Sequence, residues 1–414
     1  MEVKNSRSWP VGTYAGNKAG KTAPEARSNG TFHGDATMSI CRYRNCRAFS
    51  MSAMALVLAG GSACPAKAAD KPKPAATTGW DRQAAARYLD SREVWWQGWD
   101  RAQKDHGTLC VSCHTQAPYA LARPVLRGAL GENAPSASEV VLLASVEKRV
   151  RGWDQMPPFY SDEKYGTGKE IESRAAESVL NAVILSSYDK RQGKLGETAR
   201  MALDHAWALQ LQTGPDAGAW TWQNFDYTPW ESKESQYHWA ALMAVTVGNA
   251  PDHYRDEAKV AANLAALRGY LRSHYEAQPL LNKVVALWAS ARMPGLMTGP
   301  DRSRLVAELG RLQRTDGGWS LADLGTWVRR DNTPLETRPD GYATGLVVLV
   351  LEENRAENAA VKRGIEWLKA NQDKSTGAWP AWSLNKNRDV KSDVGKFMSD
   401  AATSYAVLAL EARR

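Results

Sequence analysis

Two stretches near the end of the chain decide the fold: Thr344-Gly-Leu-Val-Val-Leu-Val-Leu-Glu352 and Thr403-Ser-Tyr-Ala-Val-Leu-Ala-Leu-Glu411. They align without gaps, 59 residues apart. Each stretch is apolar nearly all round, which is typical of a helix enclosed by other helices. Gly317-Gly-Trp319 and Gly377-Ala-Trp379 also recur, 60 residues apart. A fixed period of this length predicts a repeat architecture in which each unit packs against its neighbours.

The segment that precedes each of these tryptophans follows a different pattern. Val361, Ile365 and Leu368 fall on one helical face, and the charged residues between them fall on the other. This pattern predicts an amphipathic helix at the surface. Enclosed and amphipathic helices in alternation imply two concentric layers. The fold class that we expect is therefore all-α.

The tryptophan turns carry a resemblance to a known family. Gln313-Arg-Thr-Asp-Gly-Gly-Trp319 resembles the glutamine-tryptophan motif of squalene-hopene cyclases and related terpenoid cyclases. Similar copies run from Arg363 to Trp379 and from Trp207 to Trp220, and Arg268-Gly-Tyr-Leu271 looks like half a motif. The resemblance implies that family's α/α toroid, with an inner ring of helices inside an outer ring. Glycine allows a tight turn there, and Gln and Trp can tie the turn to the next helix.

The amino-terminal residues predict export. From Met38, a basic start is followed by a mostly apolar stretch, Ala48 to Ala59, and by Ala66-Lys-Ala68, a small-residue cleavage site. We therefore expect residues 1–68 to be a signal peptide with its true start at Met38, and the protein to be periplasmic and soluble. The apolar stretch is too short for a stable membrane span. A lipoprotein anchored at Cys64 is the alternative.

Cleavage changes both charge and cysteine content. The first 68 residues hold nine of the 53 basic residues and three of the 45 acidic ones, which leaves 44 against 42 and a net charge of +2. This balance predicts no nucleic-acid partner. Of the five cysteines, only Cys110 and Cys113 remain. After a linker at 69–79 we expect a small helical segment at 80–168, which contains both cysteines, and the toroid at 169–414.

The sequence Cys110-Val-Ser-Cys-His114 matches the attachment motif of c-type haem. Two thiols about one helical turn apart reach the two vinyl groups, and the imidazole that follows binds iron. A disulfide, a thioredoxin-like pair and half a zinc site are the alternatives, but the mature chain has no second cysteine pair and no βαβ pattern surrounds the motif. We therefore expect one covalent haem c on Cys110, Cys113 and His114, and no zinc.

Two further features of the haem-binding segment resemble class I cytochromes c. Arg123-Pro-Val-Leu-Arg-Gly128 is similar to that family's Gly-Pro-x-Leu-x-Gly segment, although Arg123 replaces the first glycine. The resemblance implies that the carbonyl of Pro124 accepts the hydrogen bond of the ligating histidine. Gln155-Met-Pro-Pro-Phe159 resembles the family's distal loop and implies that Met156 is the second axial ligand, as suits electron transfer. Core packing of Met156 is the alternative. His106 would then be the substitute ligand, although we expect it to cap or to face solvent.

Catalytic residues are harder to place. Squalene-type cyclases use an Asp-x-Asp-Asp acid, which this sequence lacks, and protein prenyltransferases need a zinc-binding cysteine, which residues 169–414 lack. Two similar segments remain, one with Asp226 and Glu231 and one with Asp331 and Glu336. Paired carboxylates can act as acid and base or hold a cation, but Thr-Pro-x-Glu is also typical of a helix start with a capping box. We favour capping and keep the four carboxylates as catalytic candidates.

The sequence therefore predicts an exported c-type haem protein with a terpenoid-cyclase-like toroid, active in electron transfer or redox chemistry. We expect an electron-transfer partner protein, and an isoprenoid or other lipid is a further candidate ligand of the toroid. The alternatives are a cyclase-like or haem-dependent enzyme acting on such an apolar substrate, and a binding scaffold that senses redox state. If the protein is an enzyme, a haem-linked oxidoreductase is favoured over a cation cyclase.

Overall fold

The computed structural model describes residues 79–160, 166–356 and 359–412, which contain twelve α-helices and one short hairpin. The fold is all-α, as the helical patterns predicted. The helices are α1 (Arg82–Gln97), α2 (Gln116–Leu130), α3 (Ala137–Arg151), α4 (Gly166–Gln192), α5 (Glu197–Ala208), α6 (Ser235–Asn249), α7 (Ala261–Ser273), α8 (Leu280–Arg292), α9 (Gly299–Leu312), α10 (Gly341–Glu353), α11 (Ala359–Ala370) and α12 (Phe397–Glu411). The hairpin pairs β1 (Gln103–Lys104) with β2 (Thr108–Leu109). The predicted signal peptide lies outside the described residues, and within those residues no helix is both long and apolar enough to cross a membrane.

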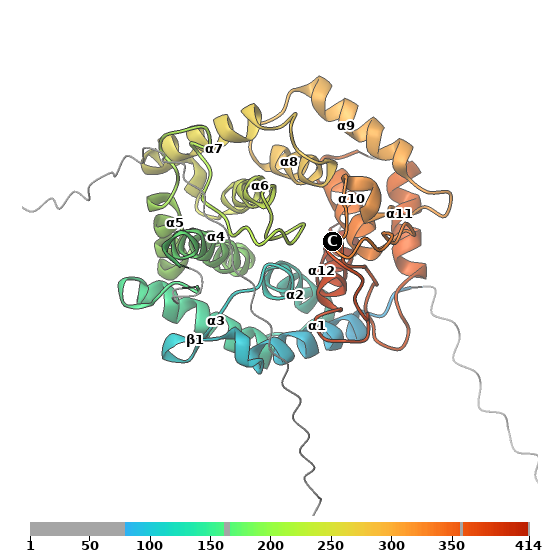
Figure 1. The fold of residues 1–414 in the computed structure, drawn as a ribbon, viewed down its shortest axis with the longest axis horizontal. Helices are drawn as coiled ribbons and strands as arrows, with labels where there is room; N and C mark the ends of the chain where they lie inside the picture. Colours follow the sequence, from blue (N-terminus) through green and yellow to red (C-terminus); the bar gives the residue numbers. More distant parts are fainter. Residues whose placement is uncertain (1–78, 161–165, 357–358, 413–414) are drawn as a thin grey trace, which may run out of the picture. The chain divides into compact units, whose positions relative to one another are not determined.

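Six helices form a closed cycle of contacts. The cycle runs from α2 to α4, α6, α8, α10 and α12, and α12 packs against α2 again. Figure 1 shows these even-numbered helices around one centre, with the odd-numbered helices outside them. In α10, all residues from Gly341 to Leu351 are buried. The repeated apolar stretches are thus inner helices, enclosed on every side as their composition predicted.

The three tryptophan turns hold the outer helices in place. Trp220, Trp319 and Trp379 are almost fully buried, and each indole N–H donates to a carbonyl of the preceding outer helix. The glutamine of each turn donates to the turn's glycine carbonyl and to the start of the next outer helix: Gln210 to Gly218 and Asn263, Gln313 to Gly317 and Ala360, Gln372 to Gly377 and Asp81. The glutamines thus confirm the expected tie to the next helix, whereas the tryptophan N–H groups bond to the preceding helix.

The last of these turns joins α11 to α1, at the other end of the described chain. The side-chain oxygen of Gln372 accepts from the backbone N–H of Asp81 at 2.7 Å. Gly377 has a φ of 82°, and a Cβ added there would lie 2.4 Å from the backbone of Ala84. Only glycine fits this turn, because it both adopts the left-handed conformation and allows the close approach of α1.

Helices on the two sides of the expected division at residue 168 pack against each other. The described residues from 79 onward form one compact unit, in which α2 packs between α12 and α4 and α3 packs on α5. The physical reason is that a closed ring needs every member: without α2, the apolar faces of its two neighbours would meet water. The segment with the two cysteines is therefore the first part of the ring.

Candidate functional site

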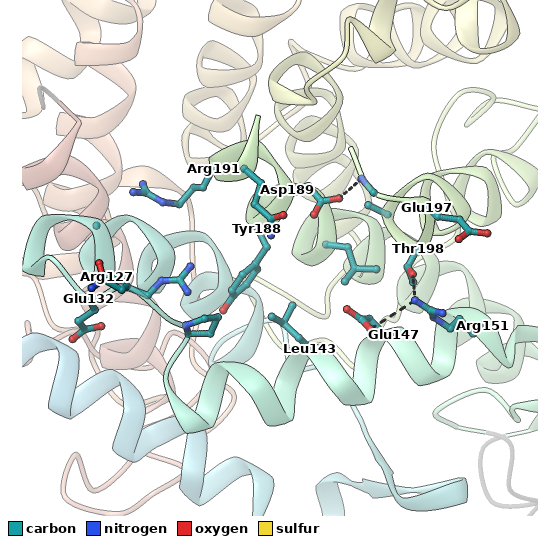
Figure 2. Close-up of a pocket in the computed structure, with 17 residues that line it drawn as sticks. Arg127, Glu132, Leu143, Glu147, Arg151, Tyr188, Asp189, Arg191, Glu197 and Thr198 are labelled. Carbon is teal, nitrogen blue, oxygen red and sulfur yellow. Dashed lines mark hydrogen bonds and ion pairs between the residues drawn. The ribbon is translucent and has the colours of Figure 1, made fainter. Parts of the chain in front are cut away.

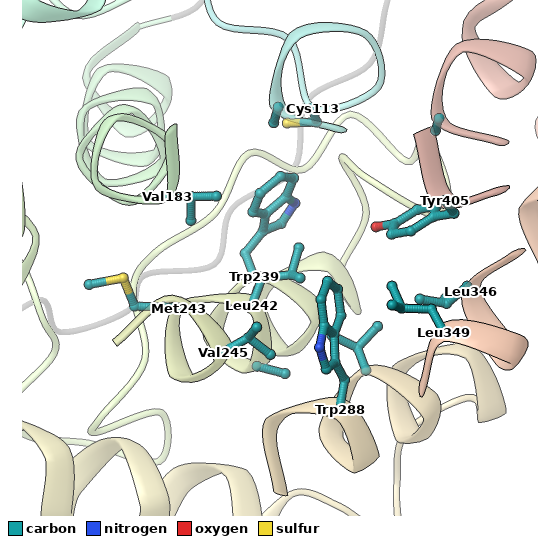
Figure 3. Packing of buried hydrophobic residues seen from close by; sticks show 14 of the residues in the cluster. Cys113, Val183, Trp239, Leu242, Met243, Val245, Trp288, Leu346, Leu349 and Tyr405 are labelled. Carbon is teal, nitrogen blue, oxygen red and sulfur yellow. The ribbon is translucent and has the colours of Figure 1, made fainter. Parts of the chain in front are cut away.

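The cysteine motif lies in the turn that leads into the inner helix α2. β2 ends at Leu109, the five motif residues follow, and α2 begins at Gln116. Cys113 is 5% exposed and belongs to the interior core, where Figure 3 shows it with Trp239 of α6. Cys110 is half-buried, and the Trp96 indole donates to its carbonyl at 2.8 Å. The motif therefore borders the interior of the ring.

Aromatic side chains from three elements surround His114. Phe397, the first residue of α12, stacks on the imidazole with 3.7 Å between the ring centroids. Trp96 of α1 and Trp230, in the loop before α6, lie 5.2 and 5.6 Å from it by the same measure. The beginnings of α2, α6 and α12 thus meet at His114. Phe397 covers a face of the imidazole, whereas a metal bond at Nε2 lies in the plane of the ring.

A chain of hydrogen bonds determines which nitrogen of His114 carries the proton. Three donors point at the carboxylate of Asp400 in α12: the Tyr88 hydroxyl, the Arg92 Nε–H and the Thr115 hydroxyl, each at 2.8 Å. Thr115 has one hydroxyl proton and uses it on Asp400. Its oxygen therefore accepts from Nδ1–H of His114, at 2.9 Å. The proton on Nδ1 leaves Nε2 with a free lone pair, which is the form that binds a metal.

Charges around the motif support this assignment. Arg92 and Asp400 form a buried ion pair, with side chains 5% and 1% exposed. Desolvation raises the pKa of Asp400, while Arg92 acts against that shift. Because the guanidinium stays protonated and donates to it, Asp400 is an acceptor in the network. Desolvation, followed by the positive charges of Arg92 and Arg388, lowers the pKa of His114 to about 3, so the imidazole is neutral.

Both motif cysteines are protonated thiols. Burial raises the pKa of Cys110 to about 12 and raises that of Cys113 as well. The negative charge of Glu231 contributes to both shifts, and Glu231 directly follows Trp230, whose ring lies 5.6 Å from that of His114. Burial also raises the pKa of Glu231 itself, from 4.5 to about 7, and the positive charge of Lys169 acts against the shift. Of the four candidate carboxylates, Glu231 is thus one that the fold brings to the cysteines.

Pro124 does not occupy the position that the cytochrome resemblance implied. It lies inside α2, ten residues after His114, which corresponds to about 15 Å along a helix at 1.5 Å per residue. Its carbonyl is therefore out of reach of the imidazole, and Thr115 takes that role. Arg123, the residue before it, holds this part of α2 against the outer layer, because its guanidinium donates to Asp90 of α1 at 3.0 Å.

Met156 and His106, the two candidates for a second iron ligand, have different surroundings. Met156 is 6% exposed, follows the 3-10 helix Trp153–Gln155, and packs its side chain against Gly152. Arg174 of α4 donates to its carbonyl. These contacts agree with the packing alternative, and ligation of iron by Met156 stays a prediction. His106 is exposed, so the expectation that it faces solvent is confirmed.

The capping interpretation of the two Thr-Pro-x-Glu segments is wrong. α6 begins at Ser235 and α10 at Gly341, in both cases several residues after the segment. The carbonyl of Glu231 accepts from two backbone N–H groups of its own turn, those of Phe225 and Tyr227. A turn closed in this way cannot also be the first turn of a helix. The residue that caps α10 is Asp340, which accepts from the N–H of Ala343.

The loops that carry the four candidate carboxylates lie together but build no acid cluster. Arg330 reaches from the second loop to the first, where it donates to the carbonyl of Asp226 at 2.5 Å. Asp331 accepts from the Thr333 hydroxyl and from the backbone N–H of Asn387, and Glu336 pairs with Arg338. In the part of the chain that the structure describes, no group of three or more His, Cys, Asp or Glu side chains is placed to hold a metal ion. Glu231 therefore differs from the other three: Asp226 is exposed and pairs with Arg330, and Asp331 and Glu336 have the partners just named.

Sequence reasoning missed Thr115, Asp400 and Phe397. Asp400 follows His114 by nearly 300 residues, and only the closure of the ring brings α12 to α2. A signal was nevertheless present, because Asp400 is a charged residue at the beginning of an apolar stretch whose repeat has Gly341 at that position. An acid in an enclosed helix requires a buried partner. Its partners are Arg92 and Thr115.

A cleft elsewhere on the molecule does not compete with the motif as a site. It has a volume of about 590 Å³ and lies between α2, α3, α4 and α5 (Figure 2). Several of its polar groups already have partners: Asp189 accepts from the N–H of Gly196, and Arg151 donates to Thr198. None of the motif residues lines it.

No protein-family model and no curated protein matches this sequence. The class of site is therefore defined by its chemistry. Two protonated thiols about one turn apart, followed by a neutral imidazole with a free Nε2, are the donor set of a c-type haem. The residues present fit that group, since Thr115 holds the imidazole proton on the nitrogen that does not bind iron.

Proposed function

We propose that this chain is a c-type haem protein in which one haem is attached to Cys110 and Cys113 and bound by His114, at one end of an α/α toroid. The observation that carries the proposal is the imidazole of His114, whose Nδ1–H is held by Thr115 while Nε2 stays free. The surrounding aromatic side chains support it further. The closed cycle of inner helices supports the toroid that the terpenoid-cyclase resemblance implied.

A bound haem would supply one-electron transfer between ferric and ferrous iron. Each of the surrounding side chains would have a separate role in holding the haem. Cys110 and Cys113 would form the covalent attachment, and His114 would give its Nε2 lone pair to the metal. Asp400 acts through Thr115 to fix the orientation of the imidazole and to strengthen it as a donor.

Electron transfer with a partner protein in the periplasm is the role that we favour. His114 is only half-buried, and its hydrogen-bond network includes the buried ion pair of Arg92 and Asp400, which suits a centre that changes charge without moving. Export rests on the proposed signal peptide at 1–68. Cation cyclisation is not proposed, because the chain lacks the Asp-x-Asp-Asp acid.

A second candidate function, a haem-linked oxidoreductase, is supported by Glu231. A carboxyl group beside the cysteines with a pKa of about 7 is suited to accept or release a proton at neutral pH. An isoprenoid or other lipid remains the candidate substrate in that case. The role of Glu231 would then be to move the proton that accompanies electron transfer to the substrate.

The iron environment separates these two functions. The test uses protein matured with the haem-attachment machinery and titrated by spectroelectrochemistry, with and without carbon monoxide. An electron-transfer protein with Met156 as second ligand should show the weak far-red sulfur-to-iron band, reversible reduction and little carbon monoxide binding, and Met156→Ala should abolish the band. A wild-type protein that lacks the band and binds carbon monoxide would favour the oxidoreductase and contradict ligation by Met156.

A further inference from the structure

A cavity of about 290 Å³ opens at the end of the ring opposite the cysteine motif. We call it the axial pocket. Its rim is formed by Val125, Lys190, Asn249, Arg292, Glu353 and Ala412. One helical turn deeper lies a second tier, formed by the residues four positions earlier: Leu121, Ser186, Val245, Trp288, Leu349 and Leu408. Every inner helix contributes to both tiers, because positions i and i+4 of parallel helices share a face.

The deeper tier is apolar except for two hydrogen-bond donors. Val245, Trp288 and Leu349 are directed at the same interior space in Figure 3. The hydroxyl of Ser186 and the indole N–H of Trp288 have no hydrogen-bond partner, although these residues are 3% and 6% exposed. Buried polar groups in folded proteins nearly always have a partner. An indole N–H can only donate, so the group missing from this tier is an acceptor.

Positive charges gather at the rim. Lys190, Arg191 and Arg292 all line the pocket, together with Glu353, which pairs with Arg292, and Glu411, which pairs with Arg82 outside the pocket. Desolvation, followed by the charges of Arg292 and Arg191, lowers the pKa of Lys190, whereas Glu353 acts against it. Crowded cations of this kind are stabilised by a bound anion. The rim therefore supplies positive charge next to the place of the missing acceptor, which favours an acceptor that is an anion.

We propose that the axial pocket binds a small amphiphilic carboxylate. Its oxygens accept from Trp288 and Ser186, Lys190 and Arg292 lie over its charge, and its apolar chain points inward along Val183. At roughly 30 Å³ for each water-sized group, the volume holds about ten such groups. That is the size of octanoate. This site is separate from the haem motif, and nothing in the proposal depends on haem attachment.

Two features of the pocket oppose binding of an anion, and the test addresses both. Glu353 and Glu411 place two carboxylates in the lining. The inner helices end at this mouth, and their C-terminal ends carry partial negative charge, which favours a cation. An alkylammonium of the same length therefore probes the opposite polarity. Octan-1-ol probes the apolar contribution alone, and acetate probes the charge alone.

The test is calorimetric titration of the full chain with octanoate, octylammonium, octan-1-ol and acetate. Octanoate should bind about tenfold or more tightly than each of the others. Trp288→Phe keeps an aromatic ring, although a smaller one, and removes the N–H, and Lys190→Met removes a rim charge. Each should weaken octanoate binding about tenfold, whereas Lys374→Met, at an exposed turn outside the pocket, should leave it unchanged. If Trp288→Phe does not fold, Lys190→Met at the exposed rim still decides.

Two results would overturn the proposal: octylammonium or octan-1-ol binding as tightly as octanoate, or unchanged affinity in Lys190→Met. The same titration on a Cys110→Ala, Cys113→Ala variant keeps the two proposals distinct. Octanoate should bind to it as it does to the wild type, because the pocket and the motif lie at opposite ends of the ring.

Discussion

At the scale of the residue, the chemistry of His114 depends on where its proton lies. The spacing of Cys110, Cys113 and His114 is enough to predict a haem motif, because thioether attachment needs these residues in this order. The tautomer does not follow from spacing. It depends on Asp400, which a different inner helix supplies, and on an ion pair with Arg92 that only the folded ring creates. The resemblance to cytochromes c misplaced Pro124, because a local match of residues does not reveal that the segment is helical.

The variant Thr115→Val tests this network. It keeps the shape of the side chain but removes the hydroxyl, so Nδ1–H of His114 loses its acceptor and both tautomers should become populated. Nitrogen-15 NMR of the imidazole in the full chain, produced without haem, measures this directly. In the haem-loaded protein, the midpoint potential should rise, because a less polarised imidazole is a weaker donor to ferric iron. Thr115→Ser should behave as the wild type. A single Nδ1–H tautomer that persists in Thr115→Val would contradict the network.

Glu231 should make stability depend on pH. Its pKa is about 7 in the folded chain against an ordinary value of 4.5, so the folded state holds the proton more tightly. The stabilisation is therefore complete below pH 4.5 and is lost as the pH rises through 7. At 1.36 kcal/mol for each pKa unit the effect is at most about 3–4 kcal/mol, and partial exposure reduces it.

Glu231→Gln should remove that part of the pH dependence, measured as the free energy of unfolding in urea at pH 5 and pH 8. Glu336→Gln is the control, because Arg338 lowers the pKa of Glu336 instead of raising it. If the free energies of unfolding of the wild type and Glu231→Gln differ by the same amount at both pH values, the carboxyl group has no raised pKa in the folded chain.

At the scale of the element, the tryptophan turns were the most predictable part of the structure. Glycine, glutamine and tryptophan act within one turn and the start of the next helix, so their spacing carries the information. The Thr-Pro-x-Glu segments were not predictable in this way. The pattern Thr-Pro-x-Glu is compatible with both a helix start and a closed turn. Contacts with other loops, such as that of Asn385 with Thr228, favour the closed turn.

Gly377→Ala tests the turn that closes the ring. The new methyl group would meet the backbone of Ala84, and alanine does not readily adopt a φ of 82°. The free energy of unfolding should fall by about 2–4 kcal/mol. In Gly269→Ala the methyl group meets no atom within 4 Å and lies inside α7, so stability should stay equal or rise by about 1 kcal/mol. Equal stability of the two variants would show that α1 does not pack on this turn.

At the scale of the whole molecule, the helices form a ring, but the sequence repeats cover only part of it. Repeats are visible after residue 170, where three motif copies lie, so a boundary was expected there. The first three helices lack the motif, and their membership in the ring depends on the contacts of α2 with α12 and α4. Such contacts between distant parts of a chain leave no local pattern in the sequence.

A fragment of residues 169–414 should therefore fail to fold on its own. It lacks α2, so the inner ring stays open and the apolar faces of α4 and α12 meet water. We expect it to show helical far-ultraviolet dichroism without a cooperative thermal transition, whereas residues 79–414 should unfold in one step. A fragment that unfolds cooperatively would mean that the remaining helices form a stable fold without the cysteine segment.

The central claim is that haem is bound covalently through Cys110 and Cys113. The most direct measurement is the mass of the denatured protein after expression with the haem-attachment machinery, together with haem staining of a denaturing gel. We expect the added mass of one haem, located by peptide mapping to residues 110–114, and a stained band that disappears in Cys110→Ala, Cys113→Ala. An unmodified wild-type mass with no stained band, or a double variant that still stains, would contradict it.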